Sequence, residues 1–365
     1  MDFAHSVLEW YAAHRRDLPW RDISDPYRIW VSEIILQQTR VVQGRSYYER
    51  FVSTFPNVES LAAATEDEVL RLWQGLGYYS RARNLLKAAR LIAAGGGFPR
   101  TFEEVRKLPG IGDYTAAAIC SFAFKLPVAV VDGNVYRVLS RFFGIDIPID
   151  TTQGKKYFAE LAQKLLPASH AADYNQGLMD FGALQCSVSS PDCSVCPLSD
   201  ACVAFARNAQ QDFPFKARRP QVKERHFVYF YVESPEGIWL HRRAAGDIWQ
   251  GLYEFPLVEF DHRPDMPEVL QHPFVVKHLS HAEGWREVAR DVKHQLTHRL
   301  LHADFFAVRT SACSLPSDCV AVPAEKLDDH AMPELLCRLR RQLWHQFGHR
   351  FRNVLFYIYR IFLQT

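Results

Sequence analysis

The chain has 365 residues, 48% of them apolar, and a formal net charge of +2. This length and composition predict two or three globular domains and exclude a disordered chain. Because the net charge is small, binding to nucleic acid would depend on local basic clusters. We find no apolar stretch of membrane-spanning length and no signal-peptide pattern, so we expect a cytoplasmic protein without a membrane partner.

Residues 1–206 have a helical pattern. Apolar residues recur at helical spacing in five segments, at positions 7–11, 29–36, 69–73, 85–92 and 158–166. Residues 207–224 include a basic, proline-containing stretch and are predicted to form a linker. From Phe227 onwards apolar residues alternate, which predicts strands and an α+β domain over residues 225–346. The tail, residues 347–365, has no pattern that indicates a role.

Four of the eight cysteines lie within seventeen residues, at Cys186, Cys193, Cys196 and Cys202. In a reducing compartment this clustering indicates a metal centre rather than disulfides. Four thiolates suit a structural zinc ion and a 4Fe–4S cluster equally well. The residue types alone therefore leave both metal centres open.

The segment LPGIG, residues 108–112, joins two segments with a helical pattern. Gly110 and Gly112 permit a tight turn whose exposed amides precede a helix, which suits a phosphate oxygen. An ordinary helix–helix turn is the alternative. About twenty residues later, Asp132 is followed by a glycine and Asn134. Asp132 either caps a helix or directs a carboxylate at a flipped nucleotide, where it would stabilise a cationic sugar.

Glu33 lies in the apolar segment WVSEIILQQTR, residues 30–40. If the surrounding helix is buried, the pKa of Glu33 is raised and the carboxyl can donate a proton near neutral pH. The alternative is a glutamate on an exposed helix face, which is the usual location of glutamate.

Taken together, these segments resemble a known group of enzymes. LPGIG followed by VDGNVYRVLSR is typical of the helix-hairpin-helix DNA glycosylase superfamily, and SEIILQQT is similar to the MutY family of adenine DNA glycosylases. The x6-x2-x5 cysteine spacing resembles the iron–sulfur loop of that superfamily and implies a 4Fe–4S cluster. The resemblance implies a multidomain protein, with a mainly α-helical helix-hairpin-helix glycosylase domain and an α+β Nudix-like C-terminal domain.

The resemblance also implies roles for single residues. Glu33 would protonate N7 of adenine, and Asp132 would stabilise the sugar cation, with Asn134 as a further catalytic residue. Bifunctional relatives carry a nucleophilic lysine where this chain has Tyr114, which implies a monofunctional glycosylase in which Tyr114 supports Asp132. Residues implied around the flipped adenine are Trp20, Arg21, Leu36, Gln38 and Gln176, of which position 176 is Glu in some members.

Recognition of the opposite base is implied at two places. Tyr78 would wedge next to that base, and the basic segment that follows it predicts a phosphate-facing helix or, alternatively, a solvated face, with Arg81, Arg83, Lys87 and Arg90. The Phe-Ser-His loop with which the family reads 8-oxoguanine is replaced here by Leu296, Thr297 and His298. His294, His298 and His302 recur at every fourth position, but the alternation around them indicates a strand rather than a zinc site.

The sequence therefore predicts a monofunctional, bacterial-type DNA glycosylase of base excision repair. It would act as a monomer on double-stranded chromosomal DNA and remove adenine paired with 8-oxoguanine or guanine. Three alternatives remain: a pyrimidine-lesion lyase, opposed by Tyr114; a non-catalytic DNA-binding protein, opposed by Glu33 and Asp132; and a Nudix hydrolase. The last is opposed by the missing run of clustered glutamates after Gly251.

Overall fold

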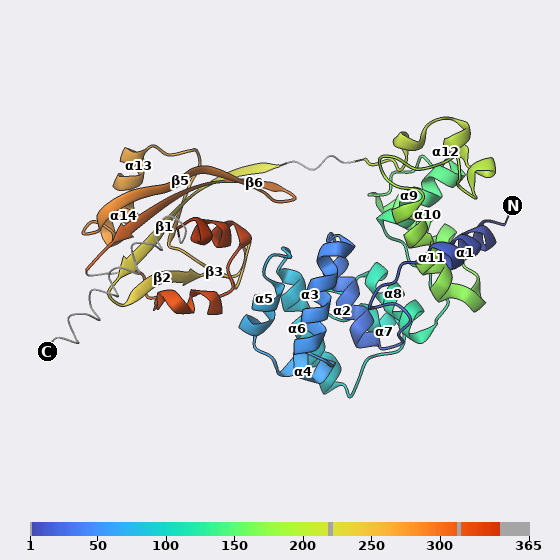
Figure 1. The fold of residues 1–365 in the computed structure, drawn as a ribbon, viewed down its shortest axis with the longest axis horizontal. Helices are drawn as coiled ribbons and strands as arrows, with labels where there is room; N and C mark the ends of the chain where they lie inside the picture. Colours follow the sequence, from blue (N-terminus) through green and yellow to red (C-terminus); the bar gives the residue numbers. More distant parts are fainter. Residues whose placement is uncertain (1, 218–221, 312–314, 344–365) are drawn as a thin grey trace, which may run out of the picture. The chain divides into compact units, whose positions relative to one another are not determined.

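The computed structural model describes residues 2–217, 222–311 and 315–343 (Figure 1). The chain divides into two compact units: Met1–Thr65 with Arg81–Arg219, and Glu66–Ser80 with Pro220–Thr365. The short segment Glu66–Ser80 thus belongs with the C-terminal unit. Within the described residues, no helix is both long and apolar enough to cross a membrane. The tail at 347–365 lies outside the described residues.

The first unit is helical and contains four of the five segments predicted as helices; the fifth, at 69–73, is helical in the second unit. Its helices are α1 (Phe3–His14), α2 (Pro26–Leu36), α3 (Val41–Thr54), α4 (Val58–Ala63), α6 (Ser80–Ala94), α7 (Phe102–Arg106), α8 (Asp113–Phe124), α9 (Gly133–Phe143), α10 (Thr152–Leu165), α11 (Ala171–Leu184) and α12 (Val203–Ala206). The helix that carries Glu33, α2, starts at Pro26, and the Asp25 side chain caps it by accepting from the Tyr27 amide. This start is favourable because proline fits the first helical turn.

Helix α11 packs closely against both α1 and α9 (Figure 1). Two glycines make this approach possible. A Cβ atom at Gly177 would lie 2.9 Å from Cβ of Tyr11 on α1, and one at Gly182 would lie 2.6 Å from Cβ of Asn134 on α9. Any larger side chain at these positions would push the helices apart.

The second unit contains α5 (Glu66–Trp73) and a seven-stranded sheet. The strands are β1 (Lys223–Ser234), β2 (Gly237–Arg242), β3 (Tyr253–Glu254), β4 (Leu257–Phe260), β5 (Glu283–Gln295), β6 (Arg299–Arg309) and β7 (Cys319–Val322). The main path runs β3-β2-β1-β6-β5, with β4 on β1 and β7 on β2. β1 and β6 are parallel, and the other pairs are antiparallel. β3 and β4 are separated at Pro256, which has no amide hydrogen for a ladder.

The central strand β1 is buried on both faces. Phe227 and Tyr229 belong to one apolar core, together with leucines of a helical segment at 334–343. Phe230 belongs to a second core, which is covered by α13 (Met266–Gln271) and α14 (Pro273–His278). Because side chains alternate along a strand, one strand supplies both cores. The sheet is therefore anchored by an apolar core on each of its two faces.

Candidate active site

Glu33 is a buried acid. It lies on α2 with 6% of its surface exposed, and the Tyr114 hydroxyl of α8 donates to Glu33 Oε2 at 2.6 Å. Burial raises the pKa of Glu33 to about 7, although the Tyr114 hydrogen bond and the Arg21 cation oppose this rise. The exposed-helix alternative for Glu33 is thus wrong. A carboxyl group with this pKa can hold and release a proton near neutral pH.

Asp132 both caps a helix and faces the same site. Its Oδ1 accepts from the Val135 amide at 2.8 Å at the start of α9, and its Oδ2 accepts from Asn134 Nδ2 at 2.7 Å. Burial raises the pKa of Asp132, while these hydrogen bonds lower it. The charge of Asp132 in turn raises the pKa of Glu33. Two carboxyl groups in such different surroundings suit opposite roles, one protonated and one ionised.

Arg137, which the sequence analysis did not single out, connects this site to the cysteine loop. It is 7% exposed, and its Nη2 donates to Asn134 Oδ1 at 2.8 Å and to the Gly182 carbonyl at 2.5 Å. Its Nε donates to the Cys186 carbonyl at 2.8 Å. In the sequence, Arg137 could be recognised only by its spacing, since it lies three residues after Asn134 and therefore on the same face of the helix. Arg137 thereby fixes the amide that binds Asp132.

The residues expected around the base lie before α2, at and after its C-terminal end, and in the middle of α11. Trp20 is buried, with its ring edge-on to Tyr48 at 5.2 Å between centroids, and Leu36 is half-buried. Gln38 is exposed directly after α2 and has φ of 59°. Such a left-handed conformation is unusual for glutamine and is often found at functional sites. Gln176 is half-buried on α11.

The LPGIG segment forms an exposed turn between α7 and α8. Gly110 has φ of +76°, and the Ile111 amide donates to the Leu108 carbonyl at 3.1 Å. α8 begins after Gly112 with no side-chain cap on its first amides. Gly110 and Gly112 are both exposed. Uncapped amides at the positive end of a helix are suited to binding a phosphate oxygen.

Comparison with known proteins places this geometry in a family. The model of the "HhH-GPD superfamily base excision DNA repair protein" matches residues 31–168, and that of the NUDIX domain matches residues 228–342. An adenine DNA glycosylase of Buchnera aphidicola subsp. Baizongia pistaciae is 35% identical over 309 residues, covering 82% of this chain and 84% of the relative. The chain belongs to the adenine DNA glycosylase family. The predicted family, enzyme class and fold class are thus confirmed.

Further comparisons agree with this assignment. The adenine DNA glycosylase of Mus musculus is 40% identical over 313 residues, covering 71% of this chain and 61% of the relative. A solved thermostable thymine-DNA glycosylase is 33% identical with a TM-score of 0.53, covering 56% of this chain and 95% of that chain. A trapped endonuclease III–DNA intermediate, 22% identical with a TM-score of 0.50 over 56% of this chain and 94% of that chain, shares the fold.

The four clustered cysteines of this glycosylase lie on one loop as half-buried free thiols. Arg141 Nη1 lies 3.4 Å from Cys186 Sγ, and Gln210 Nε2 lies 3.8 Å from Cys193 Sγ. Burial, with a contribution from the other three thiols, raises the pKa of Cys196 to about 11. Across the described ranges, however, no three His, Cys, Asp or Glu side chains are arranged as a metal site.

The basic face predicted on α6 is used partly inside the protein. Arg81 Nη1 donates to the Ile34 carbonyl at 2.8 Å and the Gln37 carbonyl at 2.5 Å, at the C-terminal end of α2. Arg90 Nη2 donates to the Ala64 carbonyl at 2.9 Å. These two arginines bind carbonyl groups at chain turns, so part of the basic charge of α6 is used to hold the backbone.

Residues expected to read the opposite base meet in the second unit. Thr297 and His298 are exposed at the turn of the β5–β6 hairpin, where the Leu296 amide donates to the Arg299 carbonyl at 2.8 Å. Leu296, which stands where the family has phenylalanine, packs against the sheet core. Tyr78 is 45% exposed with φ of 48°, and its hydroxyl forms a hydrogen bond with the Thr297 hydroxyl.

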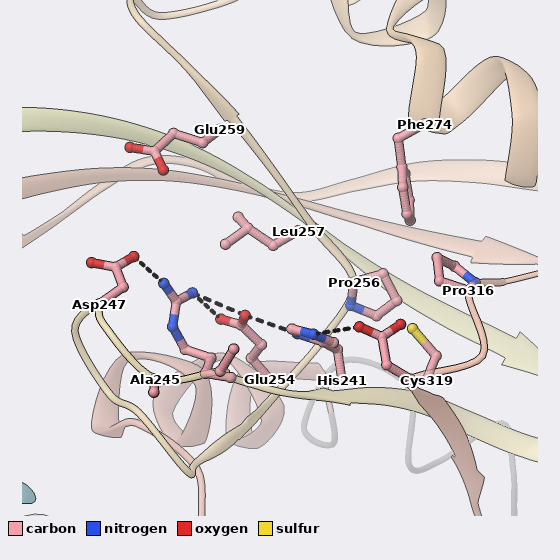
Figure 2. A pocket seen from close by; sticks show the side chains of 13 residues that line it. His241, Ala245, Asp247, Glu254, Pro256, Leu257, Glu259, Phe274, Pro316 and Cys319 are labelled. Carbon is pink, nitrogen blue, oxygen red and sulfur yellow. Dashed lines mark hydrogen bonds and ion pairs between the residues drawn. The ribbon is translucent and has the colours of Figure 1, made fainter.

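The pocket of the Nudix-like sheet holds acids that are already paired. Figure 2 shows Glu254 and His241 close together in this pocket, with Phe274 pointing in from α14. Glu254 is 2% exposed and accepts from Arg243 Nη1 at 2.7 Å, while His241 Nδ1 lies 3.3 Å from it. Hydrogen bonds from Arg225 hold the pKa of Asp247 well below its usual range. These carboxylates are neutralised by the protein's own cations, which supports the argument against diphosphate hydrolysis.

The pH dependence of base excision tests the Glu33–Tyr114 pair. The single-turnover rate should be level below about pH 7 and fall roughly tenfold per pH unit above it, as deprotonation removes the general acid. Because the Tyr114 bond lowers the pKa of Glu33, Tyr114→Phe should move the alkaline limb to higher pH. Glu33→Gln should be inactive at every pH. If the alkaline limb of the pH–rate profile does not move in Tyr114→Phe, the Tyr114 hydrogen bond does not influence the ionisation of Glu33.

Proposed function

We propose that this enzyme hydrolyses the N-glycosidic bond of adenine paired with 8-oxoguanine or guanine in duplex DNA. The observation that carries this proposal is a pair of carboxyl groups in different surroundings, Glu33 buried and Asp132 half-buried. Glu33 has a pKa of about 7 and can be protonated, whereas Asp132 is held by two hydrogen bonds at the start of α9. The names of the relatives, adenine DNA glycosylases, support adenine as the base.

The two carboxyl groups divide the reaction between them. A base stacked in a duplex is out of reach, so adenine must first be flipped into the pocket. Glu33 then donates its proton to N7, and the bond to C1′ breaks with its electron pair leaving on the neutral base. The ionised Asp132 stabilises the cationic sugar that remains. Glu33, now a carboxylate, takes a proton from the attacking water, and the product is an abasic site.

The central experiment uses four duplexes, with adenine opposite 8-oxoguanine, guanine or thymine, or with an oxidised pyrimidine. The wild-type enzyme should release adenine from the first two and cut the strand only after alkali, since Tyr114 offers no amine for a Schiff base. Asp132→Asn should lose excision and keep binding, because it removes charge and little volume. Excision by Asp132→Asn within a few-fold of wild type would remove Asp132 from the mechanism.

Preference for 8-oxoguanine is assigned to the β5–β6 turn. This lesion differs from guanine by an O8 acceptor and an N7–H donor, and Thr297 and His298 offer an exposed hydroxyl and imidazole. A contact of this kind discriminates by about 1–3 kcal/mol. The hydrogen bond between Tyr78 and Thr297 supports the assignment, because it links the predicted wedge to this turn.

Thr297→Ala combined with His298→Ala should reduce the binding preference for 8-oxoguanine over guanine about tenfold, with little change opposite guanine. The measurement is the dissociation constant for the two mispairs. Lys293→Ala, exposed on the same hairpin, is the matched control and should leave the ratio unchanged. Equal weakening on both mispairs would indicate a loss of stability, and an unchanged ratio would move lesion recognition elsewhere.

We also propose that the cysteine loop holds a 4Fe–4S cluster through Cys186, Cys193, Cys196 and Cys202. The donor set fits such a cluster, since all four thiols are free and half-buried and have N–H groups of Arg141 and Gln210 beside two of the sulfurs. When bound, the cluster would shape the loop. Arg137 would then hold Asn134 from a fixed Cys186 carbonyl.

The purified protein should be brown, with broad absorbance at about 400 nm. Cys196→Ser should leave three thiolates and give little soluble protein, whereas serine at Cys120, which is buried outside the loop, should not remove the colour. Elemental analysis of the wild type decides the metal. A colourless protein with one zinc ion per chain would show that the loop holds zinc.

A further inference from the structure

Helix α11 carries a buried acid one turn after Gln176. Asp180 has no exposed surface, and its Oδ1 accepts from Arg21 Nη2 at 2.9 Å and from Arg16 Nε at 3.0 Å. We propose that Asp180 is a positioning residue that, through Arg21, fixes which atom of Gln176 faces the base. The proposal rests on the proposed function, because it concerns how the pocket presents itself to adenine.

The Asp180 carboxylate forms ion pairs with the two arginines. Its Oδ2 is buried and has no hydrogen-bond partner within the described residues. A carboxylate in such surroundings is stable only beside opposite charge, and Arg16 and Arg21 supply it. The Arg21 side chain is itself only 9% exposed. Asp180 and Arg21 therefore hold each other in one geometry.

The other nitrogen of the Arg21 guanidinium determines the orientation of Gln176. Arg21 Nη1 donates to Gln176 Oε1 at 2.6 Å and to the Tyr11 hydroxyl at 2.6 Å, and that hydroxyl donates to Gln176 Oε1 at 2.8 Å. A guanidinium has only donors, so the atom of Gln176 that it contacts must be the carbonyl oxygen. The amide nitrogen of Gln176 is left with its two hydrogens for another acceptor.

This orientation gives the pocket a hydrogen-bond donor at position 176. A donor is complementary to a ring nitrogen of a purine and not to an amino group. Glutamate, which some relatives carry at this position, would present only acceptors when ionised. The hydrogen-bond pattern that the sequence left open at 176 is thus set by Asp180, Arg21 and Tyr11.

Arg21 also acts on the acid. Its cation lowers the pKa of Glu33. Releasing Arg21 from Asp180 should therefore affect two separate properties, the fit of the base and the pH at which Glu33 loses its proton. A residue with a merely structural role would change neither property selectively.

The test compares Asp180→Asn with Arg16→Met. Arg16 also binds Asp180, but its hydrogen bonds in the described part of the chain do not reach Tyr11 or Gln176, which makes it a matched control. Binding is measured to a duplex whose target adenosine carries a 2′-fluorine, which resists hydrolysis, and to a duplex with a tetrahydrofuran abasic analogue. The second duplex places no base in the pocket.

Asp180→Asn should weaken binding of the adenine duplex about tenfold and leave the abasic duplex unchanged. Its alkaline limb of excision should move to higher pH, because the Arg21 cation no longer lies beside Glu33. Arg16→Met should resemble wild type in both measurements. If Asp180→Asn is insoluble, Tyr11→Phe removes one of the two donors to Gln176 without removing charge and should weaken the adenine duplex alone.

Equal weakening on both duplexes, or the same behaviour in Arg16→Met, would overturn the inference. The inference would also be overturned if Asp180→Asn kept both the wild-type binding ratio and the wild-type alkaline limb. As long as the wild type still excises adenine, the proposed function would stand. A wild-type enzyme that releases adenine from no duplex would instead overturn the proposed function itself.

Discussion

The burial of one carboxyl group, that of Glu33, is the constraint on which the rest of the site depends. Removing a carboxylate from water costs several kcal/mol unless it is paired or protonated. The surrounding groups act on that cost in both directions: Tyr114 and Arg21 favour the charged form, and Asp132 disfavours it. The result is a group whose pKa, about 7, allows it to change its protonation near neutral pH. Each neighbour therefore has to be fixed in position, and further hydrogen bonds hold two of them, Arg21 through Asp180 and Asp132 through Asn134.

Features encoded in short segments could be predicted from the sequence. Gly110, Gly112 and Asp132 mark a turn and a cap, and both depend on neighbouring residues alone. Five of the helices followed from the spacing of apolar residues, as did the presence of strands from Phe227 onwards, and the break between β3 and β4 is explained by Pro256. The role of Glu33 needed the family resemblance, because a glutamate in an apolar helix does not by itself reveal that the helix is covered.

Features that depend on distant partners could not be predicted. Arg81 and Arg90 look like surface cations, yet their guanidinium groups bind carbonyls 26 to 47 residues away. Asp180 gave no signal and Arg137 only its spacing from Asn134, because Arg21 and Cys186, with which they pair, come from other parts of the chain. An ionisable residue in a helix has the same sequence pattern whether it faces water or a buried partner. Only the packing of the helices against one another decides between these two cases, and for Asp180 this is the packing of α11 against its neighbours.

That packing gives α11 an unusual position, because this one helix contacts residues at both ends of the proposed site. Gln176 lies at the end proposed to hold the base, and Gly182 packs on Asn134 at the end proposed to face the sugar, a separation of roughly 9 Å along the axis at 1.5 Å per residue. The helix thus fixes the distance between the two ends. A small slide or rotation of α11 would put both out of register at once. Selection on this helix should therefore act on its backbone path as strongly as on the side chains that touch the substrate.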